Sequence, residues 1–232
     1  MSRRSVPKSQ CQYVSQSTAL PLARQAPGVK SAPRPRYVEP LLATQAAKAP
    51  SGQRWVHEIK FDGYRLQLHK SDAGVPCYTR RGYDWAKRFP TLVTAAGQLK
   101  EHSIVLDGEA VVVTDGGGTD FSALESYVSS QQADRERHTL VYYVFDLLYL
   151  EGLDLRDVPL IERKAILKEL VGQFPHSPTK YSDHLEEDGP AVLENACDME
   201  LEGIVSKLRE GKYRSGRNMA WSKLPAATAR RL

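Results

Sequence analysis

Alternating apolar and polar residues predict strands along most of the chain that follows Gly52. The two longest runs, 103–114 and 140–150, are rich in β-branched and aromatic residues, which favour a buried strand over a helix. The full set of expected strands is 55–59, 64–68, 75–79, 103–114, 140–150, 202–208 and 219–224.

Apolar residues spaced three or four apart predict helices between these strands, over 85–99, 121–128, 159–171 and 189–199. Pro159 suits a first helical turn. The elements do not follow the regular strand–helix–strand order of a parallel sheet, and no internal repeat occurs. The pattern therefore predicts an α+β domain with two packed, largely antiparallel sheets flanked by helices.

Residues 1–36 differ from the rest because they are rich in Ser, Pro, Gln and Arg and show little periodicity. We interpret them as a flexible basic arm, either a solvated tail or a segment that contacts nucleic acid. Seven of the 32 Lys and Arg residues precede Glu39, the first acid, which leaves 25 against 28 Asp and Glu. Any contact with nucleic acid must therefore come from local patches, and residues 207–231 form a second basic segment.

The composition is that of a soluble globular protein with a sizeable core. No stretch has the apolar length of a membrane helix, and the N-terminus lacks the apolar core of a secretory signal. The three cysteines lie far apart and suggest neither a disulfide framework nor a zinc site. We expect a reducing, cytoplasmic compartment and no membrane partner.

Charged residues interrupt strands that are otherwise apolar. They occur in four groups: Lys60, Asp62 and Arg65; Asp107 and Glu109; Glu202 and Lys207; and Lys223. Burying these charges would be costly unless they pair with one another or face a ligand. Each group alone is readily explained by a structural ion pair, but together they predict a site for a polyphosphate and a divalent cation.

A lysine in such a site can act as a nucleophile if it loses its proton. A dry pocket and positive charge from Arg65, Lys223 or a metal ion would lower the pKa of Lys60. Gly63, close to it in the chain, would allow a substrate to approach the backbone.

The segment K-F-D-G-Y-R at 60–65 resembles the first signature, K-x-D-G-x-R, of the covalent nucleotidyltransferases, which comprise DNA ligases, RNA ligases and mRNA-capping enzymes. The family's other signatures follow in order: T-R-R-G at 79–82, L-D-G-E at 106–109, Y-V-F-D-L-L at 143–148, E-G-I-V-S-K at 202–207 and W-S-K at 221–223. The flanking segments, such as R-R-G-Y-D-W and Y-R-S-G-R, resemble those of the ATP-dependent ligase module in bacterial enzymes that repair double-strand breaks. This resemblance covers residues 37–225.

The resemblance implies an ATP-grasp-like nucleotidyltransferase fold, with the nucleotide between two sheets. It implies ATP as the AMP donor, Mg²⁺ or Mn²⁺ as the cation, and nicked or broken DNA as the substrate, in the cytoplasm at the bacterial nucleoid. By position, Lys60 would form the bond to AMP, with Asp62 and Lys223 also catalytic and Lys223 at the α-phosphate. The implied nucleotide contacts are Glu58, Arg65, Glu109, Phe145, Lys207 and Lys223, with Arg65 and Glu109 at the ribose and Phe145 on the adenine. The implied metal ligands are Glu202 and Glu109, and the implied DNA contacts are Arg80, Arg81 and Arg217.

Two features depart from the family pattern. Pro225 stands where the last signature, W-x-K-x-K, has its second lysine. The chain stops at Leu232, after a short tail of residues 226–232, where the resemblance implies an OB-fold domain. Either the chain is a fragment, or a separate protein supplies that domain, or the activity has decayed. Two alternatives to a DNA ligase stay open: a nucleotide- or DNA-end-binding module without turnover, and an RNA-joining or capping nucleotidyltransferase.

Overall fold

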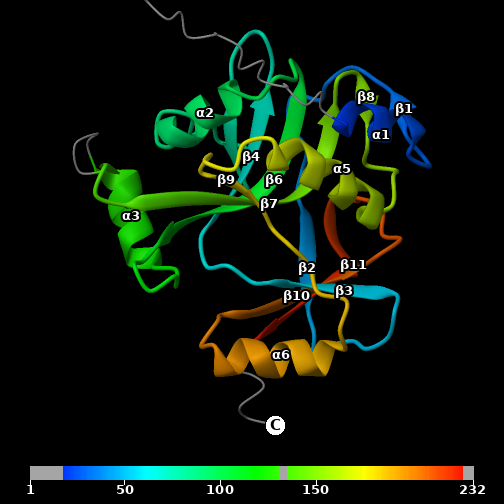
Figure 1. The fold of residues 1–232 in the computed structure, drawn as a ribbon, viewed down its shortest axis with the longest axis vertical. Coiled ribbons are helices and arrows are strands. Elements are labelled where there is room, and N and C mark those ends of the chain that lie inside the picture. Colours follow the sequence, from blue (N-terminus) through cyan, green and yellow to red (C-terminus); the bar gives the residue numbers. More distant parts are fainter. Residues whose placement is uncertain (1–17, 131–134, 227–232) are drawn as a thin grey trace, which may run out of the picture.

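The computed structural model describes residues 18–130 and 135–226, which form two sheets and the helices around them (Figure 1). The larger sheet has the strand order β1-β8-β7-β6-β4-β5, with β9 also pairing β7, and the smaller has the order β2-β11-β10-β3. The larger sheet contains β1 (Lys30–Ser31), β4 (Tyr64–Lys70), β5 (Cys77–Thr79), β6 (Ile104–Val113), β7 (Thr139–Leu150), β8 (Leu153–Asp154) and β9 (Thr179–Tyr181). The smaller contains β2 (Leu41–Gln45), β3 (Trp55–Ile59), β10 (Gly203–Leu208) and β11 (Gly216–Pro225). Only β7–β9 and β2–β11 pair in parallel within the described residues, so the predicted α+β fold with largely antiparallel sheets is confirmed.

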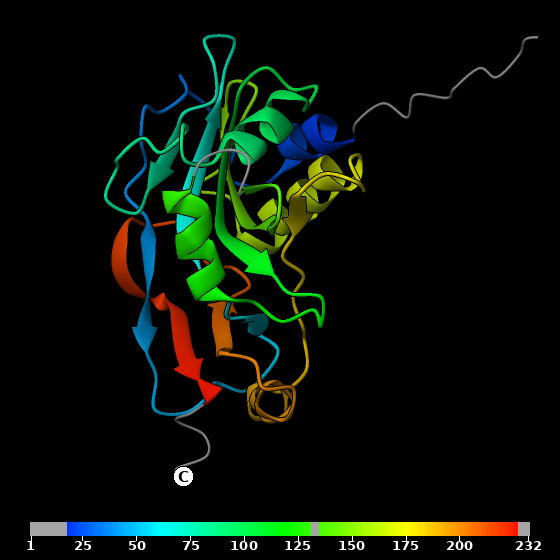
Figure 2. The ribbon, with the colours of Figure 1, turned by 90° about the vertical axis from the view of Figure 1, so that its left-hand side faces the viewer.

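The helices flank the sheets (Figures 1 and 2). Proline lies in the first turn of α2 and α6, where its missing N–H is not needed, and the Asp120 carboxylate caps α3 by accepting from the Ala123 N–H at 2.9 Å. The described helices are α1 (Ala19–Gln25), α2 (Pro90–Gly97), α3 (Phe121–Ser129), α5 (Leu160–Gly172) and α6 (Gly189–Asp198).

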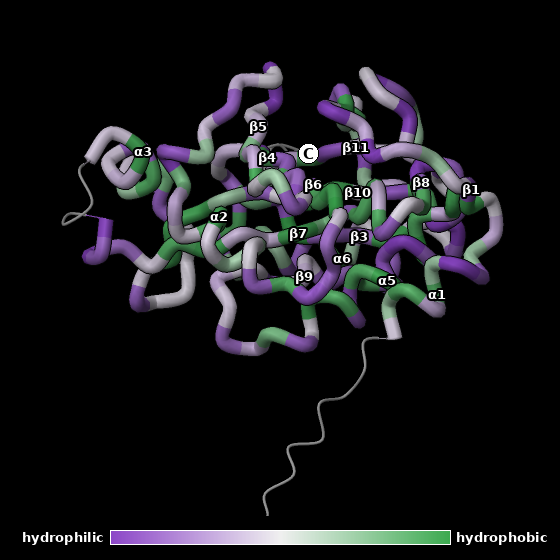
Figure 3. The backbone as a smooth tube through the Cα atoms, turned by 90° about the horizontal axis from the view of Figure 1, so that it is seen from above, coloured by the Kyte–Doolittle hydropathy of each residue, from purple (hydrophilic) through white to green (hydrophobic). Residues whose placement is uncertain are grey.

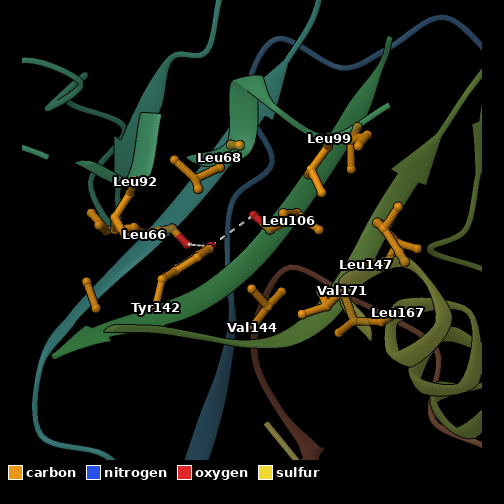
Figure 4. Close-up of a cluster of buried hydrophobic side chains, with 14 of the residues drawn as sticks. Leu66, Leu68, Leu92, Leu99, Leu106, Tyr142, Val144, Leu147, Leu167 and Val171 are labelled. Atoms are coloured by element: carbon orange, nitrogen blue, oxygen red, sulfur yellow. Dashed lines mark hydrogen bonds between the residues drawn. The ribbon is translucent and has the colours of Figure 1, made fainter. Parts of the chain in front are cut away.

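The main core lies on one face of the larger sheet. Leu66, Leu106 and Val144 from three neighbouring strands pack there with Leu167 of α5 and residues of α2 (Figure 4). Hydrophobic residues accordingly concentrate in the central strands and hydrophilic residues in the surrounding loops (Figure 3). A smaller apolar cluster fixes α6 against β10 and β11.

A third apolar cluster joins the two sheets. Leu41 of β2 and Trp221 of β11 meet Val105 of β6 and Leu148 of β7. Although β3 and β4 are consecutive in the chain, they belong to different sheets, so residues 60–63 cross from one sheet to the other. The K-F-D-G segment therefore lies where the two sheets meet.

The interpretation of residues 1–36 as an arm without regular structure is wrong for α1 and β1. Ala19 and Ala23 are fully buried where α1 packs on α5, and β1 pairs with β8. The helix was missed because its buried side chains are small and its sequence contains a proline. Residues 1–17 and the tail 227–232 lie outside the described residues.

Candidate active site

A cavity of about 850 Å³ lies between the sheets and is lined by residues of both. Most of the residues that the sequence places in the site line it: Glu58, Lys60, Asp62, Arg65, Arg80, Arg81, Glu109, Phe145, Lys207, Arg217 and Lys223. Glu202 completes the set, because its carboxylate forms an ion pair with Lys60 Nζ. The tertiary structure therefore brings all the expected residues to one place.

Lys60 follows the last residue of β3 and is held by its backbone. Its N–H donates to the Gly203 carbonyl oxygen at 2.9 Å, which ties the end of β3 to the start of β10 and sets Lys60 beside Glu202. Gly203 has φ +145°, and a Cβ there would lie 2.2 Å from the Leu224 carbonyl oxygen. Only glycine fits this position, so backbone packing explains why glycine follows Glu202 in the signature.

The pKa of Lys60 is lowered from its ordinary value, first by burial and then by the charge of Lys223, while Asp62 and Glu109 oppose the shift. Burial therefore favours the neutral amine that a nucleophile requires, whereas the ion pair with Glu202 favours the charged form. The expectation that Arg65 shares in this effect is not supported, since its charge is compensated by Asp107.

Gly63 also has a structural reason to be glycine. A Cβ at this position would lie 2.2 Å from the Ala110 carbonyl oxygen of β6. The close approach seen in the structure is thus between two backbone segments, and a close approach of substrate stays a prediction.

Arg65 is largely committed to protein partners. Its Nε and Nη2 donate to the two oxygens of Asp107 at 3.0 and 2.7 Å, Nη1 donates to the Leu41 carbonyl oxygen at 2.6 Å, and Nη2 also donates to Tyr213 Oη at 3.3 Å. Asp107 is fully buried and also accepts from Tyr213 Oη at 2.6 Å. A guanidinium has five N–H donors, so little capacity remains for the ribose contact implied by the resemblance.

The sequence predicted only part of a buried network around Glu58. Glu58 Oε1 lies 2.8 Å from both Lys164 Nζ and Lys207 Nζ, and Oε2 accepts from Ser182 Oγ at 3.1 Å. Burial alone would raise the pKa of Glu58, but the two lysines together hold it below its ordinary value. Lys164 comes from α5, whose helical pattern gave no sign that a charged residue would face inward.

Lys207 links this network to the aromatic wall of the cavity. Its Nζ lies 4.5 Å from the ring centre of Phe145 and 4.2 Å from that of Trp221, and the two rings meet edge to face. Burial lowers the pKa of Lys207 to about 8, although Glu58 opposes the shift. Phe145 lines the cavity, as a base-stacking residue must, and its contact with adenine stays a prediction.

Glu109 lies in register between Arg65 on β4 and Tyr143 on β7. Burial raises its pKa to about 8, and Asp107 and Asp62 add to the shift while Arg65 and Lys60 oppose it. No group of three metal-ligating side chains occurs in the described part of the chain. Magnesium commonly uses one or two carboxylates plus phosphate and water. The assignment of Glu109 and Glu202 as its ligands stays a prediction.

The three arginines expected at DNA are exposed and line the cavity. Arg80 and Arg81 lie on the turn after β5, which Tyr37 holds by donating from Oη to the Arg80 carbonyl oxygen at 2.8 Å. Arg217 on β11 donates from Nη1 to the Ala43 carbonyl oxygen at 2.7 Å.

Among the helices of the described residues, none has the length and apolar character that a membrane span requires.

Two packed sheets with a partly buried lysine between them and a basic rim are the fold and site of a nucleotidyltransferase. The family model "ATP dependent DNA ligase domain" matches residues 40–224. The chain therefore belongs to the ATP-dependent DNA ligase domain family. It is 39% identical over 209 residues to the multifunctional non-homologous end joining protein LigD of Pseudomonas aeruginosa, covering 89% of this chain and 24% of that protein. It is 33% identical over 190 residues to the prophage-derived DNA ligase-like protein LigB of Bacillus subtilis, covering 81% of this chain and 67% of that protein.

Solved structures show the same likeness. The ligase domain of Mycobacterium tuberculosis LigD matches with a TM-score of 0.71 and 29% identity, over 81% of this chain and 59% of that chain. A mycobacterial DNA ligase D in complex with ATP matches with a TM-score of 0.70 and 29% identity, over 80% of this chain and 59% of that chain. The chain thus spans about a quarter of the Pseudomonas relative and somewhat more than half of these solved chains.

Proposed function

We propose that this domain joins DNA strands with ATP, through an AMP group carried on Lys60. The observation that carries the proposal is the position of Lys60, a lysine with a lowered pKa that lines a cavity between the two sheets. The family membership and the ATP complex of a similar ligase support ATP as the nucleotide. The names of the LigD relatives, which refer to end joining and in one case to DNA repair, support a role at DNA ends in repair.

In the first step the lone pair of Lys60 Nζ forms a bond to the α-phosphorus of ATP. The bond from that phosphorus to the bridging oxygen breaks, pyrophosphate leaves, and the amine loses its proton to solvent. Lys223, whose charge already acts on Lys60, would neutralise the phosphate oxygens. A divalent cation held by Glu202 and Glu109 would supply further positive charge at the phosphates.

In the later steps an oxygen of the DNA 5′-phosphate attacks the same phosphorus and breaks its bond to Nζ, which frees Lys60. The 3′-hydroxyl of the adjoining strand then attacks the DNA phosphate and releases AMP. Arg80, Arg81 and Arg217 are suited to hold the 5′-phosphate strand because they are exposed at the cavity rim. An OB-fold domain, in the same or a separate polypeptide, is part of this proposal.

The test is incubation with ATP labelled with ³²P at the α-phosphorus, with Mg²⁺ or Mn²⁺, followed by a denaturing gel. We expect a labelled protein band that is lost in Lys60→Ala and kept in Lys48→Ala, an exposed lysine outside the cavity. The label should be released by acid and retained in alkali, as for a phosphorus–nitrogen bond. Sealing of a nick that already carries AMP on its 5′-phosphate then tests the last step separately.

Each outcome bears on the proposal. A band that survives in Lys60→Ala would refute the assigned nucleophile. A folded protein that takes no label and seals no adenylated nick would indicate a binding module. Labelling by GTP in preference to ATP, or joining of RNA but not DNA, would favour a different member of the nucleotidyltransferases.

A further inference from the structure

An exposed aromatic ring stands at the basic rim of the cavity and has no part in the reaction described above. Tyr83 is 64% exposed and lines the cavity together with Arg80 and Arg81. The large apolar side chains that are exposed in the described part of the chain are Leu22, Tyr83, Leu185, Met199 and Met219, and Tyr83 alone among them is aromatic.

The turn that carries Tyr83 is held in place on several sides. The Thr79 N–H donates to the Tyr83 carbonyl oxygen at 2.9 Å, and the Gly82 N–H donates to the Thr79 carbonyl oxygen at 2.8 Å. Gly82 has φ +79° and packs against the ring of Tyr37. Asp84 then accepts from two backbone N–H groups, of Cys77 at 3.0 Å and Ala86 at 2.9 Å. The ring is therefore presented to solvent by an ordered turn.

The surroundings of Tyr83 indicate what it contacts. Two exposed arginines precede it by two and three residues in the chain, and exposed Arg217 lines the same cavity. A cationic surface with an exposed aromatic ring is suited to a nucleic-acid strand, because arginines bind phosphates and the ring stacks on a base. Met199, which is 69% exposed, is a contrast because it lies between Asp198 and Glu200.

We propose that Tyr83 stacks on a nucleobase at the DNA end whose 5′-phosphate the rim arginines hold. This inference rests on the proposed function and deepens it, because it assigns a base contact where the family resemblance supplies only phosphate contacts. A terminal base pair at a break has one face that is not covered by a neighbouring pair, and that face is open to an aromatic side chain. Stacking of this kind tolerates any base.

The experiment measures the dissociation constant of a 5′-phosphorylated blunt duplex as a function of salt concentration. We expect Tyr83→Ala to weaken binding by about 5- to 150-fold, as for loss of one stacked base, and Tyr83→Phe to bind like the unchanged protein. The slope of log affinity against log salt should stay the same in Tyr83→Ala, because no phosphate contact is lost, and should fall by about one in Arg80→Ala. Met199→Ala is the matched control and should bind normally.

A second readout is the fluorescence of 2-aminopurine placed at the 5′-terminal nucleotide, which stacking quenches. Quenching should occur with the unchanged protein and Tyr83→Phe and disappear with Tyr83→Ala. If Arg80→Ala weakens binding and Tyr83→Ala does not, the stacking contact is refuted while the DNA-binding proposal stands. If Tyr83→Ala and Met199→Ala weaken binding equally, stacking is also refuted. If the unchanged protein binds no DNA end, both proposals fail.

Discussion

Replacing Arg65 with methionine should destabilise the whole domain, because this arginine compensates a buried charge. Asp107 is fully buried and accepts two hydrogen bonds from Arg65 and one from Tyr213. In Arg65→Met the carboxylate keeps only the Tyr213 contact. Methionine fills similar space but carries no donor, so the variant isolates the loss of charge and hydrogen bonds.

The expected loss follows from the burial of both partners. Their side chains are 14% and 0% exposed, so solvent screens the interaction little. Removing one partner of a buried ion pair costs about 3–5 kcal/mol, since it leaves the other charge uncompensated. For a domain of this size each kcal/mol lowers Tm by about 2–4 °C, so Arg65→Met should lower Tm by roughly 6–20 °C.

The assay is urea and thermal unfolding of Arg65→Met, Asp107→Asn and the double variant. The double variant should recover much of the stability lost in Arg65→Met, because the uncompensated charge is gone. Arg217→Met, a change at an exposed arginine, should alter the free energy of unfolding by no more than about 0.5 kcal/mol. If Arg65→Met unfolds like the unchanged protein and only loses ATP binding, Arg65 is a ribose contact and the structural assignment is wrong.

Two further predictions concern the carboxylates of the cavity. Lys164→Met should lower the free energy of unfolding by about 1.5–3 kcal/mol, because it removes a charged hydrogen-bond donor from buried Glu58. In a Glu58→Gln background the same change should cost much less. Equal losses of stability in the two backgrounds would contradict the pairing. Glu109 has a pKa of about 8 in the folded protein, against an ordinary value of 4.5, so the stability that its protonation contributes is full below pH 4.5 and is lost as the pH rises towards 8. The Tm of Glu109→Gln minus that of the unchanged protein, measured with a chelator present, should therefore increase from pH 5 to pH 8.5, and a constant difference would show that the carboxyl titrates normally.

Local sequence patterns determined most of the regular structure. The β-branched and aromatic runs at 103–114 and 140–150 and the helical spacing in 159–171 and 189–199 correspond to β6, β7, α5 and α6 to within two residues. The two strands run through the core and the two helices each bury one face, so their apolar patterns reflect burial directly. By contrast α1 buries only small alanines, and β8 and β9 contain two and three residues, too few for a periodic signal.

The sequence by itself also identified the residues that meet at the cavity, because K-F-D-G-Y-R and the later signatures are short contiguous segments. Their partners were decided only by the tertiary structure. Asp107 proved to be the counter-ion of Arg65, and Lys164 that of Glu58, although they lie 42 and 106 residues apart in the chain. Which charges compensate each other depends on the sheet register and on how α5 packs, and both arise from long-range contacts that no local pattern encodes.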